Sequence, residues 1–185
     1  MKRYTLWVMV AVVVFAAAGA QAGILGIGVT AFGGLNIPVA QDDVESGTIF
    51  GLRVPVQAIS MLRAEPWLGL AKGGDYTIPG NFGSATFPGA DVTTFGLNAL
   101  LGTPMSAPGV SIAFLAGIGS HKIKIEGLDD VSRVGYNLGV DLGVGLGAAP
   151  LSLSGRGEIL IIPLDGGGSR KNAYLTAGLT YKFGI

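Results

Sequence analysis

Apolar and polar residues alternate with a period of two along several stretches of the chain. In residues 134–146, large apolar or aromatic side chains fill the even positions, while glycine, Asn137 or Asp141 fills each odd position. Residues 151–161 and 173–183 repeat this alternation. A period of two places successive side chains on opposite faces of a β-strand. These three stretches are therefore predicted to be strands with one apolar face.

Five further strands are predicted, four of them from weaker alternation. Residues 48–58 place Phe50 and Leu52 on one face, and Arg53 and Gln57 on the other. The remaining predicted strands are residues 24–35, 62–71, 92–101 and 110–120. The longer connections are predicted at 36–47, 72–91, 121–133 and 163–171, the brief ones at 59–61 and 147–150, and one of intermediate length at 102–109. Alternating long and short connections between eight strands are typical of an up-and-down barrel with turns at one end and loops at the other.

A helical interpretation of residues 134–146 is the main alternative. Gly135, Gly139 and Gly143 recur every fourth residue, as small residues do where membrane helices pack together. On a helix, however, Asn137 and Asp141 would lie roughly 200° from this glycine face and would point into lipid. On a strand they share the glycine side, so the strand is favoured.

The first 22 residues have the pattern of a secretion signal. Lys2 and Arg3 precede an apolar run over residues 6–18, and small residues follow it directly. The run is shorter than the ~20 residues that a membrane-spanning helix needs. We therefore expect residues 1–22 to be a cleavable signal peptide and residues 23–185 to form a single barrel domain.

The composition is apolar, yet no helix-length apolar segment follows the signal. The chain has 32 glycines, a mean hydropathy of +0.56 and only 13% charged residues. Only helices and closed barrels cross a bilayer, because every backbone N–H and C=O must be paired within the protein. The predicted fold is therefore an all-β, eight-stranded, antiparallel, up-and-down transmembrane β-barrel. Apolar side chains face lipid in this arrangement, and small or polar side chains face the lumen.

Charge and cysteine content exclude some functions. Without Lys2 and Arg3, ten basic and twelve acidic residues remain, and the basic residues are not clustered. A role in binding nucleic acid is not expected, since few cations are available to neutralise phosphates. The chain has no cysteine, which excludes disulfides and a thiol nucleophile.

The signal, the eight alternating segments and the aromatic-ended last strand together resemble a known family. The last strand reads AYLTAGLTYKF over residues 173–183. In these features the chain is similar to the small outer-membrane β-barrel superfamily typified by OmpA and OmpX. The resemblance implies location in the outer membrane of a Gram-negative bacterium, contact with outer-membrane lipid and lipopolysaccharide, and assembly by the barrel-assembly machinery. It implies no cofactor, and a monomer is expected.

Charged residues on the inward faces predict a polar network in the lumen. The predicted members are Arg53, Arg63, Glu65, Asp141, Arg156 and Glu158. An eight-stranded barrel is just wide enough for side chains to fill, and enclosed charges must pair. With residues 148–149 as a two-residue turn, Asp141 lies opposite Arg156 and an ion pair is predicted. Trp67 is also predicted to face inward.

The sequence favours a structural or loop-mediated interaction role over catalysis. The alternatives are a narrow pore for small solutes, a lipid-modifying enzyme, and a soluble lipocalin-like barrel whose apolar side chains face inward. His121, the only histidine, lies near Ser120 and Glu126 at the outer end of a predicted strand. Adjacent residues on a strand point to opposite faces, so Ser120 and His121 do not form a catalytic pair. We expect an ordinary histidine at a loop edge, and no catalytic or metal site.

Overall fold

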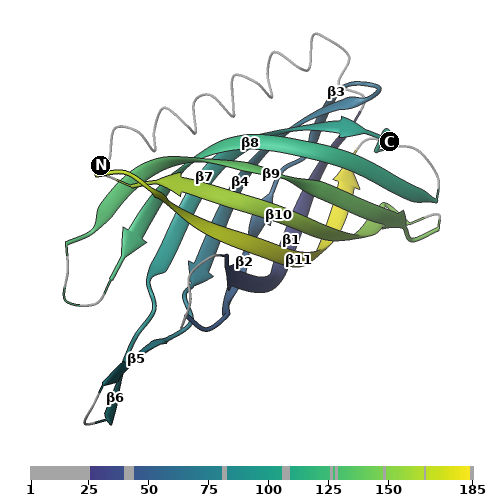
Figure 1. The fold of residues 1–185 in the computed structure, drawn as a ribbon. Coiled ribbons are helices and arrows are strands. Elements are labelled where there is room, and N and C mark those ends of the chain that lie inside the picture. The colour runs from purple at the N-terminus through teal and green to yellow at the C-terminus, as the bar shows by residue number, and fades with distance from the viewer. Residues whose placement is uncertain are drawn as a thin grey trace.

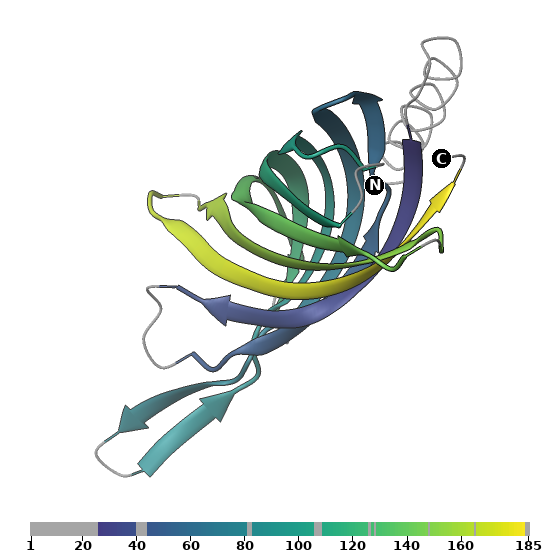
Figure 2. The same cartoon turned by 90° about the vertical axis from the view of Figure 1, so that its right-hand side faces the viewer.

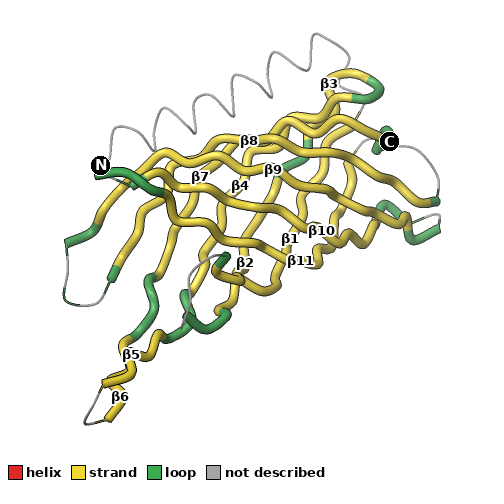
Figure 3. The backbone as a smooth tube through the Cα atoms, in the orientation of Figure 1, coloured by secondary structure: helices red, strands yellow, loops and turns green. Residues whose placement is uncertain are grey.

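The computed structural model describes residues 26–39, 44–80, 83–105, 109–125, 127, 129–147, 149–164 and 166–183. The predicted signal peptide lies outside these residues. Among them, no helix is long and apolar enough to span a membrane. Figure 3 shows strands along most of the described backbone, joined by short turns and loops.

Most of the strands form one closed antiparallel sheet (Figure 1). The strands are β1 (Gly26–Pro38), β2 (Gly47–Arg53), β3 (Val56–Ile59), β4 (Leu62–Lys72), β5 (Tyr76–Gly80), β6 (Gly83–Phe87), β7 (Asp91–Gly102), β8 (Val110–Lys124), β9 (Val131–Gly145), β10 (Leu151–Pro163) and β11 (Ser169–Phe183). The sheet order is β11-β10-β9-β8-β7-β4-β2-β1-β3, and pairing of β11 with β1 closes it. Because β3 continues β2 between the same two neighbours, the barrel has eight strand positions. The predicted eight-stranded antiparallel barrel fold is confirmed.

The two ends of the barrel differ in their connections. Residues 60–61, 103–109 and 146–150 join strands at one end, here called the turn end, where Gly26 and Phe183 also lie. Residues 39–46, 73–90, 125–130 and 164–168 join strands at the other end, here called the loop end. The predicted long–short alternation is present over the first three connections and is lost after β7, where residues 103–109 form a longer connection than 125–130 or 164–168. The loop-end connections are short there because β8 to β11 extend further toward the loop end than predicted.

The predicted strand over residues 48–58 is interrupted at its middle. Pro55 has no backbone N–H and separates β2 from β3. The backbone N–H of Val54 still donates to Pro66 O, and that of Gly28 donates to Pro55 O, both over 2.9 Å. These two hydrogen bonds keep both sides of the interruption attached to the sheet, so the barrel remains closed there.

One structured element lies where only a loop was predicted. Within residues 72–91, β5 and β6 form a separate two-stranded sheet. The hairpin extends away from the barrel at the loop end (Figures 1 and 2). The rings of Tyr76 and Phe87 stack across it with centroids 5.2 Å apart. The segment includes glycines and Pro79, which favour turns. The alternation of two short strands is therefore not recognisable in the sequence.

The outer surface of the barrel is apolar. Leu142 and Leu179 are 50% and 46% exposed, which confirms that these faces point away from the interior. Other large apolar side chains exposed on the barrel strands include Phe50, Leu52, Phe95, Leu97, Phe114, Ile118, Leu138, Leu153, Ile159 and Leu175. Apolar side chains thus point outward on neighbouring strands around the barrel.

The interior is only partly polar. A buried apolar cluster occupies its loop-end half and consists of Phe32, Ile49, Trp67, Ala71, Ala90, Val92, Ile123, Leu160, Ile162 and Tyr174. Trp67 faces inward as predicted. The expectation that small and hydrophilic residues fill the whole centre is wrong at this end, where bulky apolar side chains pack against one another. Residues 159–162 are apolar at every position, so both faces of β10 are apolar near the loop end.

Glycines in the wall make room for this packing. A Cβ atom at Gly69 would lie 2.6 Å from Cζ3 of Trp67, and one at Gly96 would lie 2.8 Å from Cε2 of the same ring. Both contacts are closer than packed atoms tolerate. The indole therefore lies over wall positions that must lack a side chain.

Candidate functional site

The interior between the apolar cluster and the turn end contains the predicted charged residues. All six lie in the lumen and are buried: Arg53, Arg63, Glu65, Asp141, Arg156 and Glu158. Five of them join in a connected set, here called the charge layer, made of Arg53, Glu65, Asp141, Arg156 and Glu158. Arg63 forms no ion pair with another residue in the described part of the chain.

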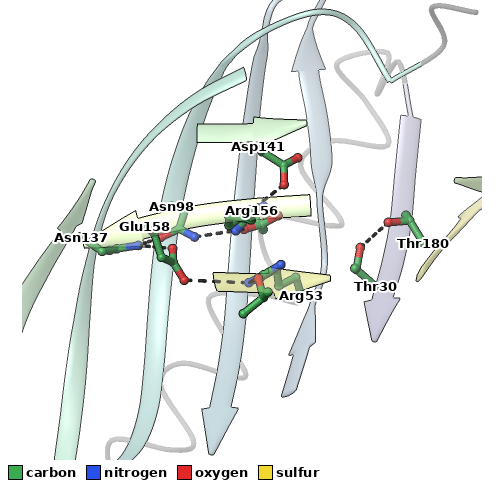
Figure 4. A network of polar contacts seen from close by, with 10 residues as sticks. Thr30, Arg53, Asn98, Asn137, Asp141, Arg156, Glu158 and Thr180 are labelled. Carbon is green, nitrogen blue, oxygen red and sulfur yellow. Dashed lines mark hydrogen bonds and ion pairs between the residues drawn. The ribbon is translucent and has the colours of Figure 1, made fainter. Parts of the chain in front are cut away.

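Arg156 lies at the centre of the charge layer (Figure 4). Its Nη1 and Nη2 donate to the two carboxylate oxygens of Glu65 over 2.6 and 2.8 Å. Its Nε donates to Oδ1 of Asp141 over 3.0 Å. The paired donors of a planar guanidinium match the two oxygens of a carboxylate, which makes this contact strong and directional. Arg156 thus joins β10 to β4 on the far side of the lumen and to the adjacent β9.

The pairing of Asp141 with Arg156 follows from strand register. Asp141 and Arg156 are direct partners between β9 and β10, as predicted from the length of the connection. Ala148, part of the predicted turn, lies outside the described residues. Glu158 lies opposite Gly139, so two like charges do not face each other. The predicted register and ion pair are confirmed.

Arg53 forms the other half of the charge layer. Its Nη2 donates to Oγ1 of Thr176 over 2.9 Å and lies 3.8 Å from a carboxylate oxygen of Glu158. Its guanidinium carbon lies 3.7 Å from the centre of the Phe32 ring, which is cation–π geometry. Arg53 therefore connects the charge layer to the apolar cluster above it.

Two amide side chains link the charged groups, and sequence reasoning gave them no such role. Asn98 donates to Glu65 over 3.0 Å, and Asn137 donates both to Asn98 over 2.9 Å and to Glu158 over 3.2 Å. Both lie on the inward face of their strands. Their positions in the alternating pattern could therefore have identified them as lumenal residues. Their partners lie across the lumen or on a neighbouring strand, and parity does not specify these contacts.

His121 is not at a loop edge, and that expectation is wrong. It lies inside β8, is fully buried, and its Nδ1 is 2.8 Å from Oγ1 of Thr94. Ser120 is exposed on the opposite face, as predicted. Glu126 lies outside the described residues. Because β8 continues to Lys124, the histidine falls within the barrel wall and points into the lumen.

This arrangement is suited to filling and bracing the barrel. Glu65 and Asp141 both accept hydrogen bonds from Arg156, so these carboxylates are already engaged. Within the described chain, no group of three or more acidic, histidine or cysteine side chains is placed to hold a metal ion. The chemistry that these contacts support is charge compensation between opposite walls of the lumen.

Comparisons with known proteins identify the fold. No protein-family model and no curated protein matches the sequence. Among solved structures, Neisserial surface protein A is similar with a TM-score of 0.66 and 15% identity over 85% of this chain and 97% of that chain. The N-terminal β-barrel domain of OprF from Pseudomonas aeruginosa has a TM-score of 0.53 and 14% identity over 85% of this chain and 97% of that chain.

A third similar structure is a major outer membrane protein from Thermus thermophilus. Its TM-score is 0.50 with 13% identity, covering 85% of this chain and 99% of that chain. Identity is low throughout, so the likeness concerns the fold. The chain has the fold of the small eight-stranded outer-membrane β-barrels.

Proposed function

We propose that this chain is an integral protein of a Gram-negative outer membrane, a closed barrel that contacts partners through its loop end. The observation that carries the proposal is the apolar outer surface around a buried charge layer. Burying apolar surface stabilises a protein by about 25 cal/mol per Å², so water is an unfavourable environment for this exterior. Lipid hydrocarbon is a favourable one, and the closed sheet leaves no unpaired edge within it.

The orientation of the side chains counts against a soluble lipocalin-like barrel. Such a barrel buries its apolar face around a ligand cavity and exposes polar residues. Here Leu138 and Leu142 point outward and are exposed, whereas Asn137 and Asp141, which directly precede them in the sequence, are buried. The apolar faces of the strands therefore point outward and the polar faces inward, which favours a membrane barrel.

The filled lumen favours a structural scaffold rather than a pore as the function of the barrel. Arg156 and Glu65 bridge opposite walls, and the apolar cluster packs above them. A narrow porin would give steady conductance steps in a planar bilayer, whereas a closed barrel gives none. We expect no steady channel from the folded protein, and regular conductance steps would favour the porin alternative.

The β5–β6 hairpin is the element best suited to contact a partner. It extends beyond the barrel, and residues 76–90 carry no charged side chain. Phe87 is 41% exposed beside Tyr76. Exposed aromatic groups on a projecting element are typical of recognition surfaces, since they bury much area at low entropic cost.

Catalysis by the only histidine has little support. His121 and Ser120 lie on opposite faces of β8, so they cannot act on one substrate together. We propose that the chain is not a lipid-modifying enzyme. A lipid deacylation assay on outer-membrane lipid tests this, and activity lost in His121→Ala would contradict it.

Cell fractionation tests the location directly. The full chain, expressed with its own N-terminal segment in a Gram-negative host, is expected in the outer-membrane fraction. The folded barrel should migrate differently from the boiled protein on a denaturing gel, because a closed barrel resists detergent unfolding. Recovery as a soluble periplasmic protein would contradict the proposal.

A further inference from the structure

A small cavity lies within the lumen at the turn end, beyond the charge layer. Its volume is about 40 Å³. A single water needs roughly 10–15 Å³ on this scale, so the space suits a few waters or one small polyatomic ion. Its polar lining includes Arg63, Lys182, Ser111, Ser152, Ser154 and Thr180. The cavity is therefore polar, and Arg156, Glu65 and Asp141 of the charge layer line it as well.

Arg63 is a buried cation without a carboxylate of its own. It is 8% exposed, and its Nε has no hydrogen-bond partner. The carboxylates of Glu65 and Asp141 also line the cavity, but both accept hydrogen bonds from Arg156. These shared carboxylates compensate Arg63 only at a distance, so a negative group in direct contact with its guanidinium would stabilise the barrel.

Lys182, on β11, adds another positive charge to the cavity lining. Its ammonium donates to the neutral backbone oxygen of Met105 over 2.7 Å. Taken with the charge layer, the described lumen between the apolar cluster and the turn end has four cations, Arg53, Arg63, Arg156 and Lys182. It has three carboxylates, Glu65, Asp141 and Glu158. The three buried arginines match the three carboxylates in number, and the half-buried Lys182 adds one further positive charge beside the cavity.

The hydroxyl groups favour an oxyanion over a bare halide. Ser152 and Ser154 lie on β10 and Ser111 on β8, and all three line the cavity together with Arg63. Hydroxyl and guanidinium N–H donors arranged around a small space match an acceptor with several oxygens. We propose that this cavity binds a small oxyanion, phosphate-sized or smaller, held by Arg63 and Lys182.

Ligand-dependent stability tests the site. Purified protein, folded in a zwitterionic detergent, is heated in rising concentrations of inorganic phosphate, with ionic strength held constant by a bulky organic sulfonate. A ligand that binds only the folded state raises the unfolding midpoint in a saturable way. We expect this rise in the wild type, and at least a tenfold higher half-saturating concentration in Arg63→Gln, because a charged hydrogen bond is lost.

Two further variants keep the test decisive. Lys182→Gln is expected to weaken the phosphate effect and serves as the test if Arg63→Gln fails to fold. Lys72→Gln, an exposed lysine at the end of β4 on the loop end, is the matched control and should respond as the wild type does. No saturable rise in the wild type would overturn the proposal. So would an equal response in the wild type, Arg63→Gln and Lys182→Gln.

Discussion

At the scale of single residues, Arg156 holds together side chains that are distant in sequence. Its partners Glu65 and Asp141 are 91 and 15 positions away. Creating such a buried ion pair adds little net stability, because both groups lose their hydration. Removing one partner is costly, because a charge is then left buried without compensation.

Glu65→Gln should therefore destabilise the barrel strongly. It removes the negative charge that Arg156 contacts through two nitrogens while leaving the side-chain volume nearly unchanged. We expect the free energy of unfolding to fall by about 3 kcal/mol. Denaturant titration of the folded protein measures it, with the exposed Glu45→Gln as control. Equal effects of the two variants would show that the charge layer contributes little.

Gly96→Ala tests the contact between the wall and Trp67. The new methyl group would overlap the indole ring, and we expect a loss of roughly 1–3 kcal/mol in the free energy of unfolding. Gly155→Ala is the control, since nothing lies within 4 Å of a Cβ at that position. Its effect should stay within about 0.5 kcal/mol. Similar values for both variants would mean that the indole moves aside at no cost.

At the scale of elements, the barrel strands and the β5–β6 hairpin are separate units. Among the described strands, β5 and β6 pair only with each other, and a single bridge between Val44 and Tyr76 connects the hairpin to a neighbouring loop. Each barrel strand instead pairs on both sides. The hairpin can therefore change while the barrel stays intact.

Replacing residues 76–87 by a short glycine–serine link should leave the barrel folded. We expect the thermal unfolding midpoint to match that of the wild type, because no barrel pairing is lost. The gel shift between folded and boiled protein provides a second measurement. A clear fall in the midpoint would show that the hairpin supports the barrel, and its proposed role as a contact element would then need a different test.

At the scale of the whole molecule, the closed sheet separates an apolar outside from an enclosed charge layer. In a bilayer, the cost of an outward-facing charge depends on depth, about 2–4 kcal/mol at the midplane and about 0–1 kcal/mol near the interface. Leu138 lies midway along β9, and Val144, on the same outward face, is the last residue but one at the turn end. Both side chains are exposed.

Leu138→Arg should therefore destabilise the protein in lipid bilayers far more than Val144→Arg. The free energy of unfolding is expected to fall by about 2–4 kcal/mol for the first variant and by about 0–1 kcal/mol for the second. Reversible unfolding from phospholipid vesicles by denaturant measures both. Equal and small effects would contradict insertion of this surface in hydrocarbon.

The sequence alone determined the eight strand positions of the barrel, their outward faces and one contact. Alternation is local, so residues 134–146 revealed which side of β9 turns outward without any knowledge of its neighbours. The Asp141–Arg156 contact followed as well, because a short connection sets the register of two consecutive strands. The depth of His121 was misjudged, since the end of a strand depends on how far its neighbours extend.

Tertiary structure alone decided how the lumen is filled. Closure of β11 on β1 brings opposite walls within reach, and only then does Arg156 contact Glu65, Asn98 join the charge layer, and Arg63 remain beside a cavity. The apolar cluster at the loop end also depends on closure. The alternation along a strand predicts that a side chain points inward. The diameter of the barrel and the stagger of its strands determine which side chain it contacts there.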